Sequence, residues 1–459
     1  MDTNKNSTEN KMGVQPVGKL LFGMAVPIML SMLVQAFYNI VDSMFVSQIS
    51  ETGNELTALT LAFPLQSLMI AFGGGTMLGM NTIISKSLGR GDRDSADRAA
   101  GTGLVLTFIT AAIFALVGLF LSRPFFEFQT EIKEIADFGV TYTSICLVGS
   151  IGIFCQFCFE RMLQSTGRTM LSTITQFTGA VINIIFDPIL IFGIDGFIPA
   201  MGVAGAAIAT VSGQMVAAVM GLIFNLKYNP DVRLRLKNLR LHLSTAAEIY
   251  KIGLPSIIMQ SVGSLTTFTL NNILIFKFTE AAATVYGVYF KLQSFIFMPV
   301  FGLNNGMVPI ISYNYGAKKP DRVKKTIKIS VITAVSVMAV GYAVFLAFPE
   351  ALLGIFNPTA EMVDMGKACL RLIGLSFIPA GFCIITISVT QAIGNPFFSL
   401  ITSACRQLVV LLPVAFLMSL TGKLWAVWLA FPFAEVASLI LSMVFLAMTM
   451  RKATREMTE

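Results

Sequence analysis

The chain has 459 residues, of which 55% are hydrophobic and only 12% are charged, and its formal net charge is +7. Soluble domains carry about twice that share of charged residues. The composition therefore excludes an ordinary soluble protein and favours a protein of the lipid bilayer.

The hydrophobic residues gather in twelve runs, each long enough to cross a hydrocarbon core about 30 Å thick. The runs cover residues 16–48, 57–80, 98–121, 135–160, 168–193, 201–226, 249–276, 281–306, 324–348, 362–390, 395–420 and 424–449. We therefore expect an all-α polytopic membrane protein with twelve transmembrane helices.

The basic residues lie on one alternating set of connecting segments. Of the 32 lysines and arginines, 24 fall in the N-terminal tail, around residues 86–98, 161–168, 227–251 and 318–328, and in the C-terminal tail. The opposite loops are acidic or neutral, as in 127–137. Because cytoplasmic loops carry an excess of Lys and Arg, we expect a multi-pass membrane protein with both termini in the cytoplasm. The positive charge then reflects topology, and no nucleic-acid partner is expected.

The remaining composition signals are weak. The polar N-terminus precedes a full-length apolar run and does not have the pattern of a removable signal peptide. All six cysteines lie in apolar runs, so Cys155 and Cys158 are interpreted as packing residues rather than a disulfide. The only histidine, His242, lies between runs, which argues against a multi-histidine metal site.

The chain contains an internal repeat. LeuGlnSer at 65–67 recurs at 292–294, IleIleSer at 83–85 recurs at 310–312, and Gln164 with Gly167 recurs as Gln391 with Gly394. In all three pairs the two copies are separated by the same number of residues, the number that separates positions 65 and 292. We infer a duplication into two six-helix lobes, residues 1–226 and 248–459, joined by a basic linker at 227–247. With six helices each, the lobes enter the membrane from the same side and should enclose a central cavity.

Polar residues inside the predicted spans of the first half share helix faces at four-residue spacing. The first span contains Tyr38 and Asp42, with Gln35 and Asn39 close to that stripe. The fifth contains Asn183 and Asp187, followed by Pro188, which frees the carbonyl of Ile184 because proline has no N–H. The sixth contains Ala206 and Thr210 among small residues that permit close helix approach.

An ionisable side chain at membrane depth is costly and indicates function. Carboxylate, amide, hydroxyl and free carbonyl oxygens are the ligands that a hard monovalent cation prefers. Asp42, Asn183, Asp187 and Thr210, with a carbonyl near Ala206, supply all four kinds. For Asn183 or Thr210 alone, a hydrogen bond between neighbouring helices is an equally simple interpretation. Either Na⁺ or a proton would suit the two carboxylates.

The second half lacks this set. Thr269 and Val414 stand where the repeat places the counterparts of Asp42 and Asp187. Its spans contain Lys291, Arg406 and Glu435 instead, and these either line the cavity or pair with one another. We therefore expect the first half to be the lobe that couples to a cation. Near the end of the fourth span, Glu160 and Arg161 are interpreted as an interfacial ion pair.

Several segments resemble the multidrug and toxin extrusion (MATE) transporters, and in particular their bacterial MepA/DinF-like branch. They are YNIVDSMFVSQI, TLAFPL, SKSLGRGD, QSTGR, NIIFDPILIFG and GVAGAAIAT. The resemblance covers nearly the whole chain. It implies two six-helix lobes in the bacterial plasma (inner) membrane and outward export of amphipathic, often cationic compounds, driven by a Na⁺ or H⁺ gradient. It also places a cation site on Asp42, Asn183, Asp187, Thr210 and Ala206.

The resulting expectation is a secondary active multidrug efflux transporter that works as a monomer without an enzymatic cofactor. Its substrate cavity is expected to include Gln35, Tyr38 and Asn39, with Lys291, Arg406 and Glu435 as candidates from the second half.

Three alternatives compete with this interpretation. A flippase for lipid-linked oligosaccharides would share the fold and would be favoured by abundant cations in the central cavity. The interpretation as a major-facilitator transporter, a different twelve-helix fold, is supported only by the charged GRGDRD loop. An intramembrane enzyme lacks support, because the sequence contains no paired zinc ligands, no nucleophile with a histidine partner and no phosphate-binding GxxxxGK[ST] loop.

Overall fold

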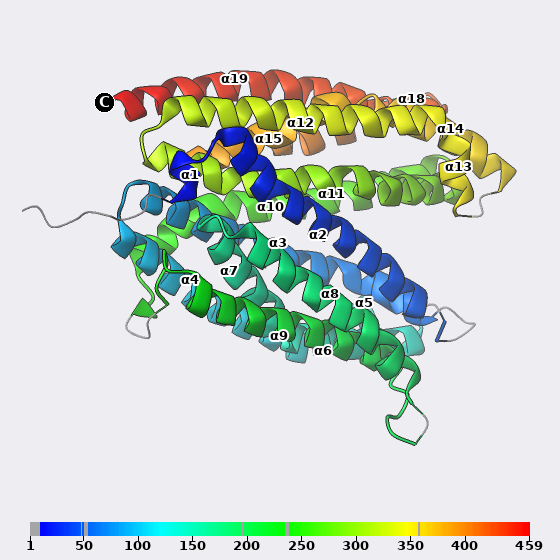
Figure 1. The fold of residues 1–459 in the computed structure, drawn as a ribbon. Helices are drawn as coiled ribbons and strands as arrows, with labels where there is room; N and C mark the ends of the chain where they lie inside the picture. The colour runs from blue at the N-terminus through cyan, green and yellow to red at the C-terminus, as the bar shows by residue number, and fades with distance from the viewer. Residues whose placement is uncertain (1–9, 47, 50–53, 195, 235–237, 357–358) are drawn as a thin grey trace, which may run out of the picture.

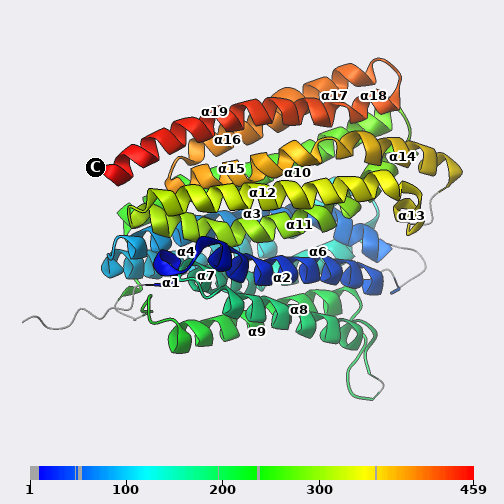
Figure 2. The ribbon, with the colours of Figure 1, turned by 45° about the horizontal axis from the view of Figure 1, so that its top comes forward.

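The computed structural model describes residues 10–46, 48–49, 54–194, 196–234, 238–356 and 359–459, apart from the side chains of residues 38–40, 43 and 280. Long helices that lie side by side dominate it (Figures 1 and 2). A short helix, α1 (Lys11–Val14), precedes them. The first half then contains α2 (Val17–Val46), α3 (Asn54–Gly89), α4 (Arg93–Phe120), α5 (Ser122–Gln129), α6 (Lys133–Val148), α7 (Ile151–Ser165), α8 (Thr169–Phe192) and α9 (Val203–Tyr228).

The second half repeats this order after a connection at residues 229–242. Its elements are α10 (Leu243–Lys277), α11 (Glu280–Gly316), α12 (Pro320–Ala347), α13 (Pro349–Gly354), α14 (Ala360–Gly374), α15 (Phe377–Ile393), α16 (Pro396–Ala404), the π-helix η2 (Cys405–Leu411), α17 (Leu412–Ser419), α18 (Leu424–Trp428) and α19 (Ala430–Thr458). The yellow to red helices α12–α19 lie together on one side of the molecule (Figure 1).

The predicted spans have counterparts in these helices. Within the described ranges, nine helices are long and apolar enough to cross a membrane, and two bent pairs, α6 with α7 and α14 with α15, bring the number to eleven. The remaining run, predicted at 249–276, is α10, whose 35 residues are ample for a span. Polar side chains in its second half, such as Gln260, Asn271 and Asn272, make it less apolar than the others.

The two bent pairs also bear on the duplication. The first bends by 43° between Val148 and Ile151, and the second by 48° between Gly374 and Phe377. The two breaks are separated along the chain by nearly the same number of residues as the repeated sequence motifs. The two halves therefore share a bend at corresponding places, as expected if both descend from one six-helix unit. The exact lobe boundaries at residues 226 and 248 stay a prediction.

The halves pack tightly toward one end of the molecule, which we call the basic end because it carries residues 86–98, 227–234, 238–251 and 318–328. There α3 meets α10 and α11 backbone to backbone. A Cβ added to Gly75 would lie 2.8 Å from the Gly253 carbonyl oxygen, and one added to Gly253 would lie 2.6 Å from that of Gly75. A Cβ on Gly89 would overlap the carbonyl oxygen of Tyr313. Only glycine permits this approach between the halves.

The short helix α1 lies across the same end and joins both halves. Asn10 Nδ2 donates to the carbonyl oxygen of Thr166 in the first half at 3.2 Å. The carbonyl oxygen of Met12 accepts from Asn314 Nδ2 at 3.0 Å and from Arg322 Nη2 at 2.9 Å, both in the second half. The C-terminus lies at this end too (Figures 1 and 2). The structure therefore holds the halves together at the basic end, from which α2 diverges away from α12 (Figure 1).

Candidate cation site in the first half

The candidate site lies where α8 packs closely against α9. A Cβ on Gly179 would lie 3.0 Å from the Gly213 carbonyl oxygen, and one on Gly213 would lie 2.5 Å from the Gly179 carbonyl oxygen. A Cβ on Gly205 would overlap the backbone of Leu190. Small residues thus allow the two backbones to touch, as the GVAGAAIAT segment predicts. The polar side chains of α8 and α9 are brought face to face.

Three of the predicted site residues form one hydrogen-bonded cluster in this interface. Asn183, Asp187 and Thr210 are all buried, and Asp187 is 0% exposed. The side-chain amide of Asn183 can satisfy both Asp187 and Thr210 when its nitrogen points to Asp187 and its oxygen to Thr210. In this orientation, Asn183 Nδ2 donates to Asp187 Oδ2 at 3.0 Å. Asn183 Oδ1 then accepts from the Thr210 hydroxyl at 3.2 Å. The four-residue spacing of Asn183 and Asp187 therefore places them together as predicted.

Asp42 reaches the same region from α2. Helix α2 packs directly on α8, and Ser31 Oγ donates to Gln176 Oε1 across this contact at 2.6 Å. The carboxylates of Asp42 and Asp187 are near enough for their charges to interact. Asp42 Oδ1 is buried and has no hydrogen-bond partner among the described residues. A second carboxylate with an unsatisfied oxygen thus lies on the helix that packs against α8.

Backbone groups near the cluster add further acceptors. Pro188 lies inside α8 and cannot donate to the carbonyl of Ile184, one turn earlier. Ala206 is fully buried in α9, one turn before Thr210. Its role as a carbonyl ligand stays a prediction, because its carbonyl lies within a regular helix.

The arrangement can hold a small cation or a proton. Two carboxylates in a medium of low dielectric repel each other strongly, so that one proton or one monovalent cation between them is favourable. In the described part of the chain, no three His, Cys, Asp or Glu side chains gather into a metal-binding group. A cation here would therefore be held by two carboxylates together with the amide, hydroxyl and carbonyl oxygens. Both Na⁺ and H⁺ fit this ligand set.

The predicted cavity residues are more scattered. Gln35 is partly buried on α2, and the side chains of Tyr38 and Asn39 lie outside the described residues. Lys291 is exposed on α11, and its Nζ lies 5.8 Å from the centre of the Phe356 ring. This contact is a cation–π interaction within the second half. The structure does not bring Lys291 to the acidic cluster.

Arg406 and Glu435, for which the sequence leaves two interpretations open, pair internally. Arg406 Nη1 donates to Glu435 Oε1 at 2.9 Å, and only 24% and 11% of the two side chains are exposed. Arg406 lies in the π-helix η2, which ends shortly before Pro413. Pro413 cannot donate a backbone hydrogen bond, and π-helical turns often accompany such a break. The pair neutralises one cation of the second half, which removes support for an anionic lipid substrate there.

We predict that this ion pair stabilises the fold. Glu435→Leu leaves Arg406 as an unpaired, largely buried charge and should cost about 3 kcal/mol of stability. The double variant Arg406→Leu/Glu435→Leu removes both charges and should recover most of that loss. The melting temperature of the purified protein measures this. Equal melting temperatures for Glu435→Leu and the double variant would show that the two charges are not coupled.

The prediction of an interfacial ion pair between Glu160 and Arg161 was wrong. Glu160 is only 5% exposed and accepts from Gln156 Nε2 at 2.9 Å, because successive helix positions point in different directions. Arg161 Nη1 donates instead to Asn305 of α11 at 3.0 Å and so bridges the halves. The four-residue spacing of Gln156 and Glu160 was the signal in the sequence that could have revealed the first contact.

Comparison with known proteins agrees with this architecture. A model of the MatE family matches residues 27–189 and again residues 255–417, so the two matches are offset by nearly the spacing of the repeat. The multidrug export protein MepA of Staphylococcus saprophyticus is 27% identical over 429 residues, 93% of each chain. MepA of Staphylococcus aureus is 26% identical over 430 residues, again 93% of each. The solved outward-facing structure of a multidrug resistance MATE family transporter covers 98% of this chain and all of its own, with a TM-score of 0.91 at 22% identity.

Proposed function

Because the chain belongs to the MatE family of multidrug and toxin extrusion transporters, we propose that it is a secondary active exporter of amphipathic, often cationic compounds. Relatives that cover 93% of the chain are named multidrug export proteins, which supports this substrate class. We further propose that export is driven by exchange for H⁺ or Na⁺. The observation that carries this mechanism is the fully buried Asp187, hydrogen-bonded to Asn183, with the unpartnered carboxylate oxygen of Asp42 on the neighbouring helix α2.

The repeat supports an alternating-access cycle between lobes 1–226 and 248–459, with residues 227–247 as a cytoplasmic linker. The family match occurs once in each proposed lobe. If the basic end faces the cytoplasm, as the excess of Lys and Arg favours, this structure is closed toward the cytoplasm. Binding of the coupling ion drives the cycle only if the ion favours one conformation over the other. The ligands from α2 and α8 must therefore move relative to each other during transport.

Reconstituted protein tests this function directly. Proteoliposomes loaded with a fluorescent cation, under separately imposed Na⁺ and H⁺ gradients, should show export driven by one of the two gradients. Transport that follows neither gradient would contradict antiport. Movement of a lipid-linked oligosaccharide, with no movement of cationic dyes, would favour the flippase instead.

We predict that the basic end is cytoplasmic. A cysteine at Asp94, on the basic side, should resist an impermeant maleimide in intact cells, while one at Glu131, on the opposite side, should react. The native thiols give little background, because five of the six cysteines are buried and the sixth, Cys405, is partly buried and can be replaced by serine. Mass spectrometry of the labelled protein measures the result. Labelling at Asp94 but not at Glu131 would reverse the proposed orientation.

A further inference from the structure

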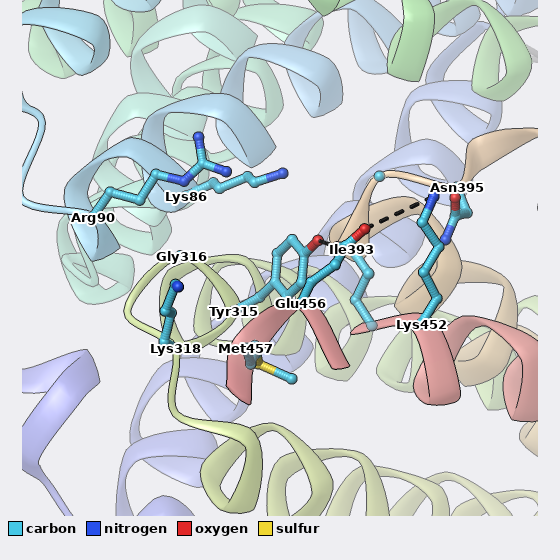
Figure 3. Close-up of a pocket in the computed structure, with 11 residues that line it drawn as sticks. Lys86, Arg90, Tyr315, Gly316, Lys318, Ile393, Asn395, Lys452, Glu456 and Met457 are labelled. Atoms are coloured by element: carbon cyan, nitrogen blue, oxygen red, sulfur yellow. Dashed lines mark hydrogen bonds and ion pairs between the residues drawn. The ribbon is translucent and has the colours of Figure 1, made fainter. Parts of the chain in front are cut away.

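A second polar feature lies at the basic end, away from the acidic cluster. A cavity of about 450 Å³ opens between the ends of α3, α11, α15 and α19. Figure 3 shows Lys86 and Arg90 extending from α3 on one side, opposite Tyr315 of α11 and Glu456 and Lys452 of α19. Both halves of the chain therefore contribute to its walls.

The walls carry an excess of positive charge. Lys86, Arg90, Lys318 and Lys452 line the cavity, and the only carboxylate among the lining residues is Glu456. Glu456 is already engaged, since it accepts from the Tyr315 hydroxyl and its Oε1 lies 3.9 Å from Lys452 Nζ. Arg90 and Lys318 have no ion-pair partner in the described part of the chain, and the Nζ of Lys86 lies 4.7 Å from the centre of the Tyr315 ring. Positive charge is thus left without a counter-ion.

Lys318 is held in an unusual backbone conformation at this cavity. Its φ of 55° is the only positive φ of a non-glycine residue among those described. The sequence repeat pairs it with Gly91, whose φ is 77°. The first half thus uses glycine where the left-handed conformation is needed, and the second half places a lysine there. Strained residues of this kind cluster at functional sites, and here the strain fixes a cation at the cavity.

We propose that this cavity is a binding site for a phosphate-bearing anion. The guanidinium of Arg90 suits paired hydrogen bonds to phosphate oxygens, and the ammonium groups of Lys86 and Lys318 add compact positive charge. Basic pockets between transmembrane helices on the cytoplasmic side suit acidic lipid head groups. The phosphate can therefore come from the head group of an acidic phospholipid or from a soluble phosphate ion.

The surface of α19 favours the lipid source. Val444 and Met448 lie four residues apart on α19, and Lys452 follows Met448 at the same spacing, so neighbouring members of this series lie one above the other on the helix. Val444 and Met448 are 49% and 51% exposed, although both are apolar. An exposed apolar strip on α19 thus leads to Lys452 at the cavity, and an acyl chain would lie along it when the head group occupies the cavity.

The site is complete only when the lobes meet at the basic end. Its two sides are joined by the close approach of Gly89 to Tyr313 and of Gly316 to Lys86. Separation of the halves there would pull the cations of α3 away from those of α11 and α19. A bound phosphate is therefore expected to favour this closed conformation. The inference rests on the cavity and the adjoining surface of α19, and it does not depend on the proposed export activity.

Binding can be measured on the full-length protein in a neutral detergent. The three probes are phosphatidylglycerol, phosphatidylcholine and inorganic phosphate, and the readouts are native mass spectrometry and the shift of the melting temperature. Phosphatidylglycerol should bind and raise the melting temperature, whereas phosphatidylcholine should not. Removing two cations with Arg90→Gln/Lys318→Gly should weaken binding about thirtyfold, since each basic residue near a lipid phosphate contributes about fivefold.

The variants separate binding from folding. Lys318→Gly restores the residue type that its counterpart has, so the melting temperature without anion should not fall. The matched control is Lys324→Gln/Lys325→Gln, which removes two cations of the same end that do not line the cavity. It should keep the affinity for phosphatidylglycerol within about twofold, because solvent-exposed charges that do not contact the anion are screened by water and salt.

The possible outcomes divide clearly. Selective binding of phosphatidylglycerol that the cavity variant loses supports the site with a lipid ligand. Binding of inorganic phosphate that the same variant loses, with no preference between the two lipids, supports the site with a soluble anion. The proposal is overturned if no probe binds, or if the control variant loses as much affinity as the cavity variant.

Discussion

Replacement of Asp187 by asparagine is expected to abolish gradient-driven export while leaving the protein folded and inserted. Asn has the size of Asp and keeps hydrogen bonds to Asn183, but it removes the charge that would hold a proton or Na⁺. Without that charge, the ion gradient has no means of favouring one conformation. Export of a fluorescent cation from proteoliposomes should fall to the level of protein-free liposomes, a loss of at least ~100-fold if the coupling is obligatory.

Two companion variants sharpen this prediction. Asp42→Asn should have the same effect, and the double variant should be little worse than either single one, because residues that act as one unit are not additive. Asp321→Asn is the matched control, since Asp321 is an exposed carboxylate at the start of α12. If Asp187→Asn exports the dye at the wild-type rate with the same ion dependence, Asp187 is a structural residue and the coupling mechanism is contradicted.

A methyl group at the glycine contact between the lobes should also stop transport. A Cβ at Gly79 of α3 would overlap the carbonyl oxygen of Ile249 in α10. Because backbone atoms cannot move aside as a side chain can, Gly79→Ala must push the two helices apart at the basic end. The closed conformation would lose population, and a cycle that passes through it would slow. We expect a fall in export of at least about tenfold, from a penalty of the size seen when a core is overpacked.

The matched control lies slightly earlier in the same helix. A Cβ at Gly74 would meet only the side chain of Gln260, at 3.7 Å, which is an ordinary contact. Gly74→Ala should therefore transport at a near wild-type rate. As an opposite test, a crosslink between residues 85–97 and 313–325 should lock the basic end shut and halt transport while drug binding persists. Equal export by both glycine variants, or full export by a crosslinked sample, would exclude rocking about this contact.

The amino-acid sequence by itself determined the class of the protein and its duplication. Apolar runs of about twenty residues leave a lipid-spanning helix as the only way to satisfy their backbone groups, so the twelve runs could be found without a structure. Only α10 was less apolar than expected, since polar residues such as Gln260 and Asn271 interrupt it. The offset between the repeated motifs agrees with that between the two family matches, which begin at residues 27 and 255.

Within one helix, sequence spacing was also sufficient for part of the site. Four residues make just over one helical turn, so Asn183 and Asp187 had to lie on the same face of α8 whatever surrounds them. The glycines and alanines of α9 likewise indicated a close neighbour, which is α8. Such predictions need only the period of the helix and the size of its side chains.

Which faces meet across the molecule was decided by tertiary packing. Arg406 and Glu435 lie 29 residues apart on different helices, and Arg161 reaches Asn305 across the lobes. The sequence marked these side chains as unusual but gave no partner, because helices with the same pattern of apolar residues can pack at several angles and rotations. The approach of Asp42 to Asp187, and the cavity that gathers Lys86, Arg90 and Lys318, depend on where α2, α3 and α11 cross. That depends on long-range packing of whole helices, for which the spacing along one chain carries no signal.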